Sequence, residues 1–196
     1  MPRPVDHDER RREIARAALR LLSSKGPAGL SMRAVARELG GSLTVVTHYY
    51  STRRELLVDL PQQLAQDWSE DLSVLEAQAA TPRARLRTLL AWLLPLDREG
   101  LQEEMARFSL LVASTDADSS EALAGFDDYV RELLRQHVTG LVPDDAVESS
   151  VELFRAFTNG IVVNAVMDPV GWPASRQEAL LDQAIGLILP NEGLPE

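Results

Sequence analysis

The sequence contains no cysteine, few aromatic residues and no long hydrophobic run. The absence of cysteine excludes a disulfide framework, a thiolate zinc site and a cysteine nucleophile. No run of about 18 apolar residues is present, so we expect no transmembrane helix. The first residues, MPRPVDHDERRRE, include no apolar segment of the kind found in a signal peptide. We therefore expect a soluble cytoplasmic protein.

Motifs typical of enzymes are also missing. The chain has no Gly-rich phosphate loop, no Gly-x-Ser-x-Gly and no His-Glu-x-x-His. Its three histidines, His7, His48 and His137, lie far apart in the sequence and lack the spacing of metal ligands. We therefore predict that the protein is not an enzyme and has no metal site and no cofactor.

Charge is distributed unevenly along the chain, whose formal net charge is −10. Residues 1–60 hold eleven basic and seven acidic residues, whereas residues 61–196 hold nine basic and twenty-three acidic ones. A basic N-terminal segment on an acidic body is typical of a protein that meets nucleic acid with its N-terminal part. The acidic residues can equally serve only to keep the body in solution.

Apolar residues recur with helical spacing along most of the chain, and no convincing strand or internal repeat is present. Expected caps are Ser42, the pair Thr52 and Glu55, and the pair Ser175 and Glu178. Pro61 predicts a kink. We expect an all-α protein of about nine helices, near residues 6–25, 32–39, 42–50, 53–78, 82–94, 101–113, 122–138, 147–167 and 176–189.

Residues 31–54 have the pattern of a helix-turn-helix motif. A short amphipathic helix ends at Gly40-Gly41, and a second helix follows in which Val46 and Tyr50 point inward. In this geometry the second helix enters the major groove of DNA. Its outward side chains, the candidates for reading base edges, are Ser42, Leu43, Thr44, Thr47 and His48.

The same region resembles the N-terminal pattern of the TetR family of bacterial one-component repressors. The resemblance covers roughly residues 10–57 without a gap, and it departs from the family pattern at Gly41, where Val is usual, and at Thr47, where Tyr is usual. The matching residues are Gly26, Ser31, Val35-Ala36, Leu39-Gly40-Gly41-Ser42, Thr47-His48-Tyr49-Tyr50 and Arg53-Arg54-Glu55-Leu56.

The resemblance implies further contacts with DNA. It implies that Arg33 reads guanine and that Ser31, Tyr49 and Arg53 contact phosphates. These residue types suit the task, because hydroxyls and guanidinium groups bind phosphate oxygens. We also expect residues 10–12, three consecutive arginines, to add non-specific attraction to DNA.

The two last helices predict a homodimer. One helix-turn-helix gives too little contact for a specific site, so such proteins pair and read two half-sites. Residues 151–167 are apolar on nearly every side and residues 176–189 are amphipathic, which favours a four-helix bundle across a two-fold axis. The alternative is that both helices are core of one chain. The candidate interface residues are Phe154, Ile161, Val162, Leu181, Ala184, Ile185 and Ile188.

Large apolar side chains are scattered over the middle helices. Such residues are usually core, and the resemblance implies that they also line a small-molecule cavity, in which polar side chains orient a ligand. The candidate pocket residues are Trp68, Trp92, Met105, Phe108, Phe126, Phe157 and Asn159.

Together these features predict a ligand-responsive transcriptional regulator. We expect a repressor that binds a palindromic operator as a homodimer through residues 1–52 and is released by a small molecule bound to residues 53–196. Activation rather than repression is a further possibility within the family. A helical ligand-binding or partner-binding module with weakened DNA recognition is the alternative function.

Overall fold

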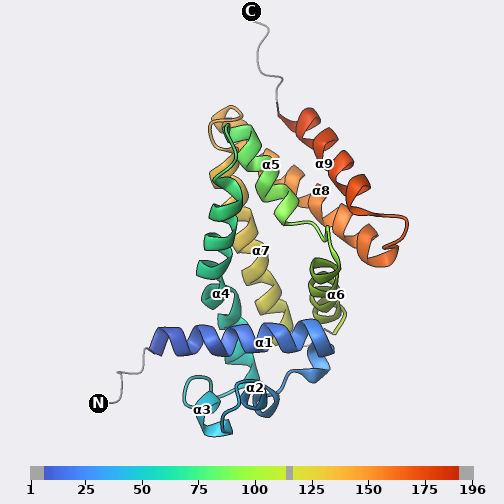
Figure 1. The fold of residues 1–196 in the computed structure, drawn as a ribbon. Helices are drawn as coiled ribbons and strands as arrows, with labels where there is room; N and C mark the ends of the chain where they lie inside the picture. The colour runs from blue at the N-terminus through green and yellow to red at the C-terminus, as the bar shows by residue number, and fades with distance from the viewer. Residues whose placement is uncertain (1–6, 114–116, 190–196) are drawn as a thin grey trace, which may run out of the picture. The chain divides into compact units, whose positions relative to one another are not determined.

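The structure, a computed structural model, describes residues 7–113 and 117–189. This part of the chain forms nine α-helices and one 3-10 helix, and its only β-type pairing is an isolated bridge between Thr139 and Val142 (Figure 1). The prediction of an all-α fold of about nine helices is confirmed. The chain divides into a first unit, residues 1–68 with 102–127, and a second unit, residues 69–101 with 128–196.

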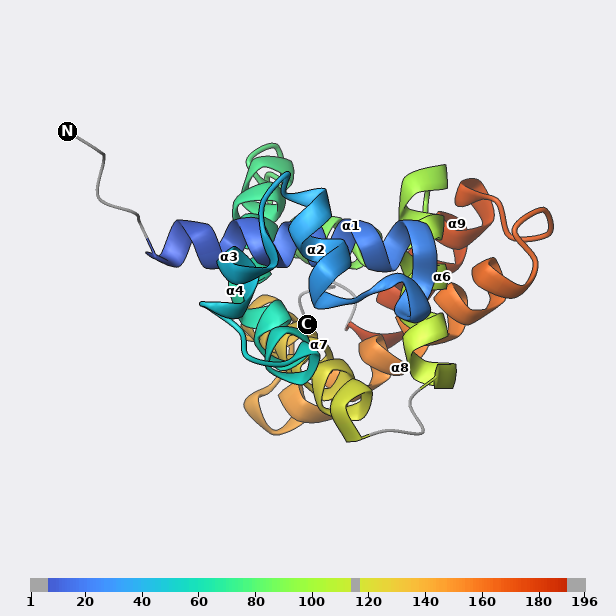
Figure 2. The ribbon, with the colours of Figure 1, turned by 90° about the horizontal axis from the view of Figure 1, so that it is seen from below.

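The first unit contains α1 (His7–Gly29), α2 (Met32–Glu38), α3 (Leu43–Thr47) and the start of α4 (Arg53–Glu76), together with most of α6 (Arg98–Ala113) and the start of α7 (Ala117–Val138). Figure 2 shows α2 and α3 lying across α1, and α2 packs against both of them. A continuous core holds these helices together, and α1 supplies the face that the sequence predicts: Ile14, Ala18, Leu21 and Leu22.

Gly26 closes the first straight part of α1. Its φ of 66° lies in the left-handed region that favours glycine, as the sequence predicts for this position. Residues 27–29, beyond the predicted end of the first helix at residue 25, form one more helical turn after the kink at Gly26. Pro27 fits there because the first turn of a helix needs no amide donor.

The turn between α2 and α3 is closed by two backbone hydrogen bonds. The amide of Gly40 donates to the carbonyl of Arg37 (3.0 Å), and that of Gly41 donates to Ala36 (2.9 Å). This is the Schellman pattern, and of the two glycines in this turn Gly40 has the positive φ, of 64°. Since a β-carbon at Gly41 would be in ordinary contact with its nearest neighbours, the departure from the family pattern at Gly41 leaves the turn intact.

The helix caps agree with the predictions in part. The Thr52 hydroxyl accepts the amide of Glu55 (3.1 Å), as predicted, but the Glu55 carboxylate accepts the amide of Ser51 (2.6 Å) rather than that of Thr52. The predicted hydroxyl cap at Ser42 is wrong, because Ser42 precedes α3 without a side-chain cap bond. Its hydroxyl is therefore available to a ligand.

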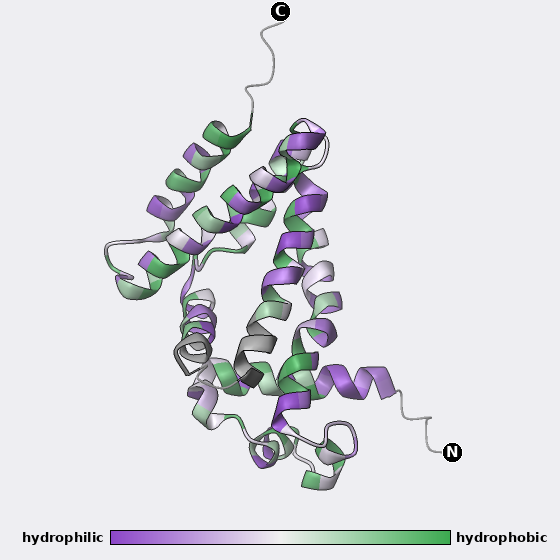
Figure 3. Ribbon diagram, turned by 180° about the vertical axis from the view of Figure 1, so that it is seen from behind, coloured by the Kyte–Doolittle hydropathy of each residue, from purple (hydrophilic) through white to green (hydrophobic). Residues whose placement is uncertain are grey.

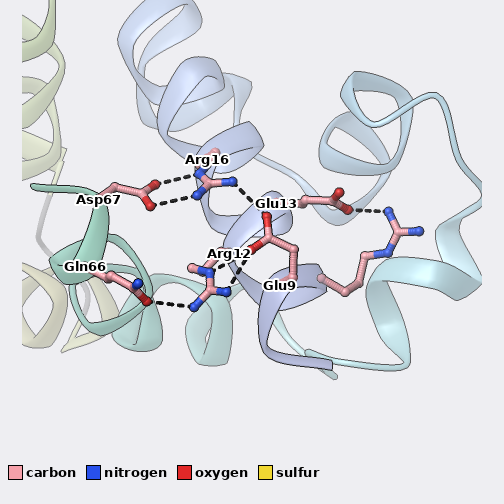
Figure 4. Close-up of polar contacts among 7 residues, drawn as sticks. Glu9, Arg12, Glu13, Arg16, Gln66 and Asp67 are labelled. Carbon is pink, nitrogen blue, oxygen red and sulfur yellow. Dashed lines mark hydrogen bonds and ion pairs between the residues drawn. The ribbon is translucent and has the colours of Figure 1, made fainter. Parts of the chain in front are cut away.

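A polar seam joins α1 to α4 (Figure 4). The Arg16 guanidinium donates two hydrogen bonds to the Asp67 carboxylate (2.5 and 2.7 Å) and a third to Glu9 (3.0 Å). Arg12 bridges Glu9 and the side-chain oxygen of Gln66 (2.9 Å). The seam fixes α4 to α1, the helix against which α2 of the helix-turn-helix motif packs. The boundary predicted between residues 52 and 53 thus lies inside the first unit.

Replacing Asp67 by asparagine is expected to lower the free energy of unfolding by about 1 kcal/mol at pH 7. The hydrogen bonds from Arg16 hold the pKa of Asp67 below its ordinary value, against the opposing effect of burial. A carboxylate with a lowered folded pKa stabilises the fold above its unfolded pKa, and this stabilisation is lost as the pH falls through the folded pKa. Urea unfolding of the wild type and of Asp67→Asn should therefore give different free energies of unfolding at pH 7, and this difference should disappear at acid pH.

Asp182→Asn is the matched control, since Asp182 receives two hydrogen bonds from Arg87 (2.6 and 3.0 Å) in the second unit. Its side chain is 50% exposed, against 26% for Asp67, so solvent screens this pair more strongly. If the two variants lost equal free energy of unfolding, or if the loss in Asp67→Asn did not depend on pH, the polar seam would not stabilise the first unit as proposed.

The second unit contains the end of α4, α5 (Pro82–Trp92), the end of α7, η1 (Asp144–Ala146), α8 (Val147–Met167) and α9 (Ala174–Ile188). Helix α9 packs against α5 and α8. His137 of α7 lies between the Leu133 carbonyl (2.7 Å) and the Glu76 carboxylate of α4 (2.6 Å), which ties the ends of these helices together.

Two helix starts differ from the predictions. Helix α7 begins at Ala117 rather than Ala122, because polar residues there continue the helix instead of forming a loop. Helix α9 begins at Ala174 after Pro173, so the predicted cap Ser175 lies inside the helix. Helix α4 continues through Pro61, and the kink expected there stays a prediction.

Candidate nucleic-acid interface

The outer side of α3 presents the five side chains that the sequence predicts as base readers. We call this set the reading face: Ser42, Leu43, Thr44, Thr47 and His48, all of which are exposed. On the opposite side Val46 and Tyr50 are almost completely buried in the first unit's core. Because the buried side anchors α3, the reading face is held on a rigid support.

The reading face combines polar groups with one apolar group. Leu43, which is 37% exposed, can meet the methyl group of thymine. The Thr47 hydroxyl lies within hydrogen-bond distance of the carbonyls of Leu43 (3.2 Å) and Thr44 (3.4 Å) and donates within its own helix. Thr47 therefore faces outward as an acceptor, and it can donate to DNA only by giving up this bond.

Two predicted DNA contacts lie at the start of α2. The Ser31 hydroxyl caps α2 by accepting the amide of Ala34 (3.2 Å), which leaves its own proton for another acceptor. Arg33 is exposed, and among the described residues its guanidinium has no ion-pair partner. A guanidinium group without an ion-pair partner in the protein suits bidentate recognition of guanine.

The other two predicted phosphate contacts are already engaged within the protein. The Tyr49 hydroxyl lies 3.1 Å from Nδ1 of His7, and its ring meets that of His48 edge to face at 5.0 Å. Arg53 is half-buried and donates from Nη2 to the carbonyl of Pro27 at 3.4 Å. Both side chains thus have fixed positions before any partner is bound.

The arginines at 10–12 are less available for non-specific attraction than the sequence predicts. Each is paired with a carboxylate: Arg10 with Glu13 (2.6 Å), Arg11 with Asp59 (3.4 Å) and Arg12 with Glu9 (2.8 Å). Their positive charge is therefore largely balanced inside the first unit. We expect a correspondingly smaller contribution to non-specific binding.

Sequence reasoning missed the support beneath the reading face. The buried Tyr50 donates its hydroxyl proton to Asp59 of α4 (2.7 Å), while the Arg11 guanidinium lies 5.3 Å from the centre of its ring. Burial, followed by the bond to Asp59, raises the pKa of Tyr50, so this hydroxyl remains a neutral donor. No local spacing signals these contacts, because their partners lie on different helices.

The predicted pocket residues are divided between the two units. In the first unit, Trp68 and Phe126 pack with ring centres 5.4 Å apart, and Phe108 is half-buried. Met105, expected to point inward, is 49% exposed. The second unit holds the others, all half-buried: Trp92, Phe157 and Asn159. Their role as a pocket stays a prediction.

In the second unit, a groove of about 310 Å³ lies between α5 and α9. It is crossed by the ion pair of Arg87 and Asp182, and none of the predicted pocket residues lines it. Its lining residues are Thr81, Arg83, Ala84, Arg87, Asp182 and Ile185.

The predicted interface residues lie mostly inside one chain, and their role in an interface stays a prediction. Ile188 is half-buried, and the other six are at most 4% exposed within one chain: Phe154, Ile161, Val162, Leu181, Ala184 and Ile185. They pack α8 against α9 and its neighbours, so they belong to the core of the chain, which was the alternative.

A different side of α8 is apolar and open. We call it the α8 seam: Leu153, Ala156, Gly160, Val163 and Met167, whose alternating steps of three and four residues match a coiled-coil repeat. Leu153 is 55% exposed and Met167 79%, and on α9 Leu187 is 83% exposed. Figure 3 shows hydrophobic residues recurring along both helices. This side remains open to a partner.

Two further observations concern the residues that the structure describes. They include no group of three or more His, Asp or Glu side chains arranged to hold a metal ion. None of the described helices has the length and hydropathy needed to cross a bilayer.

Two family models match the chain. That of the bacterial regulatory proteins of the tetR family matches residues 14–60, and that of the C-terminal part of BetI-type transcriptional repressors matches residues 82–190. The first match contains α2, α3 and the reading face. Both models describe regulators rather than enzymes, in agreement with the prediction from the sequence.

Individual proteins are similar over most of the chain. The HTH-type transcriptional regulator PksA of Bacillus subtilis is 28% identical over 194 residues, which are 94% of this chain and 92% of PksA. The HTH-type transcriptional regulator BetI of Agrobacterium fabrum is 24% identical over 164 residues, which are 83% of this chain and 80% of BetI.

Solved structures share the fold. A transcriptional regulator from Rhodococcus sp. Rha1 has a TM-score of 0.72 at 26% identity and covers 91% of this chain and 95% of its own. A Saccharomonospora viridis protein in complex with choline has a TM-score of 0.70 at 16% identity and covers 92% of this chain and 97% of its own, which supports the fold alone. From these matches, and from the helix-turn-helix that the structure contains, the chain belongs to the TetR family of bacterial transcriptional regulators.

Proposed function

We propose that the protein is a cytoplasmic repressor that binds an inverted-repeat operator as a homodimer and leaves it when a small molecule binds. TetR-family regulators are ligand-responsive DNA-binding repressors that act as dimers. The observation that carries the proposal for this chain is the exposed reading face on the rigid support of Val46 and Tyr50. Side chains held in this way can meet base edges without a large loss of conformational entropy.

The α8 seam and Leu187 support the dimer. A β-carbon added at Gly160 or at Gly186 would meet nothing within 4 Å, so both glycines leave room for another helix to approach closely. A two-fold axis would place the same apolar surface on both sides of the interface. We propose that α8 and α9 of two copies pack there as a four-helix bundle.

Helix α4 supports the link between effector and DNA, because it begins in the first unit and ends in the second. It is bound to the motif by Asp59, which accepts from Tyr50, and to α1 by Asp67, which accepts from Arg16. We propose that a small molecule held by the residues C-terminal to residue 52 favours an orientation of α4 that no longer fits two half-sites about 34–36 Å apart. The effector then increases the population of dimers that cannot fit both half-sites, and it does not block the reading face.

Selection of bound duplexes from random DNA tests the function. We expect the purified protein to enrich an inverted repeat whose half-site centres are about one helical turn, or a multiple of it, apart. Its affinity should fall steeply with rising salt because bound phosphates release counterions. Enrichment of no sequence would overturn the proposal and favour the helical ligand-binding module.

Pro61→Ala is expected to retain operator affinity within about threefold but to reduce release by an effector. Pro61 is buried, and a β-carbon added at Gly125 would lie 3.3 Å from its Cγ, so the ring packs closely against α7. Alanine restores the amide donor that proline lacks and stiffens α4, by up to about 3 kcal/mol in helix propensity. The measurement is operator affinity with and without a compound that releases the wild type, found in a metabolite screen.

Pro82→Ala is the control for this variant, because Pro82 occupies the first position of α5, where no intrahelical bond is lost. It should release like the wild type. If the effector also released Pro61→Ala from the operator as readily as the wild type, α4 would not transmit effector binding to the DNA-binding helices.

A further inference from the structure

Three aromatic rings gather where α1 begins and the segment after α3 ends. His7 Nδ1 lies 3.1 Å from the hydroxyl of Tyr49, and their ring centres are 5.7 Å apart. The His48 ring lies 6.3 Å from that of His7 and 5.0 Å from that of Tyr49. His7 and His48 are exposed, whereas Tyr49 is half-buried against the core. The tyrosine ring is therefore held by the protein, while its hydroxyl end lies among two titratable groups.

The direction of the hydrogen bond between His7 and Tyr49 depends on which histidine nitrogen holds the proton. A phosphate oxygen can only accept a hydrogen bond, so Tyr49 must use its single proton to bind one. His7 Nδ1 must then carry a proton and donate to the Tyr49 oxygen. In the opposite tautomer Nδ1 accepts the tyrosine proton, and the hydroxyl is turned away from a phosphate.

We propose that His7 is a positioning residue for DNA: by donating from Nδ1 to the Tyr49 hydroxyl, it directs the tyrosine proton towards the DNA backbone and makes operator affinity depend on the protonation of His7. This inference rests on the proposed DNA binding. It adds a residue outside the helix-turn-helix to the interface and gives that residue a defined chemical task.

The charged groups around His7 favour this role. On α1, Asp8 is its neighbour in the chain, Glu9 is bound by Arg12 and Arg16, and Arg10 is paired with Glu13. From the segment after α3, His48 and Tyr49 face it.

On α4, the carboxylate of Asp59 is also engaged by residues of other segments. Asp59 binds both Tyr50 and Arg11. Among the residues that the structure describes, His7 has no ion-pair partner of its own. A proton gained by His7 therefore adds positive charge beside the Tyr49 hydroxyl. Proton uptake favours binding to phosphate, so we expect affinity for DNA to rise as the pH falls.

Three variants separate the hydrogen bond from the ring. His7→Phe keeps an aromatic ring but removes the donor, and it should lower affinity for the selected duplex about tenfold, because the dimer loses one hydrogen bond at each half-site. In His7→Asn the amide nitrogen stands near the position of Nδ1 and donates at every pH. This variant should bind within about twofold of the wild type at pH 6 and lose the His7 part of the pH dependence. Tyr49→Phe should abolish the effect of His7→Phe.

The measurement is duplex affinity from pH 5.5 to 8 at constant ionic strength, with His48→Asn as the control for the second histidine. Equal losses for His7→Asn and His7→Phe, or an undiminished effect of His7→Phe in the Tyr49→Phe background, would overturn the inference. So would a pH profile that no His7 substitution changes. If the wild type itself enriches no duplex, the proposed function fails instead, so the two failures are distinguishable.

Discussion

Replacing Leu187 by glutamate is expected to convert the dimer into monomers and to lower affinity for an inverted repeat by at least about 100-fold. Leu187 is 83% exposed in one chain, so the substitution leaves the core of that chain unchanged. Across a two-fold axis each substitution acts twice, and two carboxylates would enter one apolar interface. Separate monomers lose the high effective concentration that links the second half-site contact to the first.

Analytical ultracentrifugation and duplex titration measure the two effects. Val74→Glu is the matched control, because Val74 is 72% exposed and lies on α4, away from the α8 seam. The Val74→Glu protein should stay dimeric and bind the inverted repeat with the affinity of the wild type. A dimeric Leu187→Glu protein would show that the interface lies elsewhere. A monomeric protein with full affinity would contradict the need for paired half-sites.

Replacing Arg33 by alanine is expected to lower operator affinity about 25-fold or more and to relax the preference at one base pair of each half-site. A bidentate contact to guanine contributes about 1–3 kcal/mol of discrimination, and the dimer makes it twice. A contact to phosphate would instead weaken binding to all sequences equally. Because Arg33 is exposed, its removal should not change the free energy of unfolding measurably.

Arg37→Ala is the control, since Arg37 is an exposed arginine on the same helix. It should cause a small, sequence-independent loss. The comparison requires selection of duplexes with both variants and with the wild type. Equal losses for the two variants, with no base position relaxed, would identify Arg33 as an ordinary surface charge and remove it from the readers.

The sequence predicted the parts of the fold that local spacing determines. Helix α8 was expected at 147–167, and the structure has it there, because its apolar residues recur without interruption up to the Asp168-Pro169 break. The start of α7 was missed because polar residues that continue a helix have no apolar period. The turn at Gly40 and the outward reading face were predicted correctly, since both depend on neighbours within a few residues.

Contacts between segments that are distant in the chain could not be predicted from the sequence. The spacing of Phe154 and Leu181 indicated that they are buried but not what buries them, and the exposed Leu187 was not among the predicted interface residues. His7 and Tyr49 meet because the start of α1 lies beside the segment after α3, and no periodicity in the sequence indicates this contact. The bonds that Asp59 and Asp67 accept from Tyr50 and Arg16 likewise join distant segments, and no local spacing predicts them.

The central claim is that two copies hold their reading faces on one side of a duplex. The most direct measurement compares the selected inverted repeat with the same duplex after insertion of about five base pairs between the half-sites, half a helical turn. We predict two chains on the first duplex and a loss of at least about 100-fold on the second, because the half-sites then lie on opposite faces. Equal affinity for both duplexes, or one chain per duplex, would contradict the account.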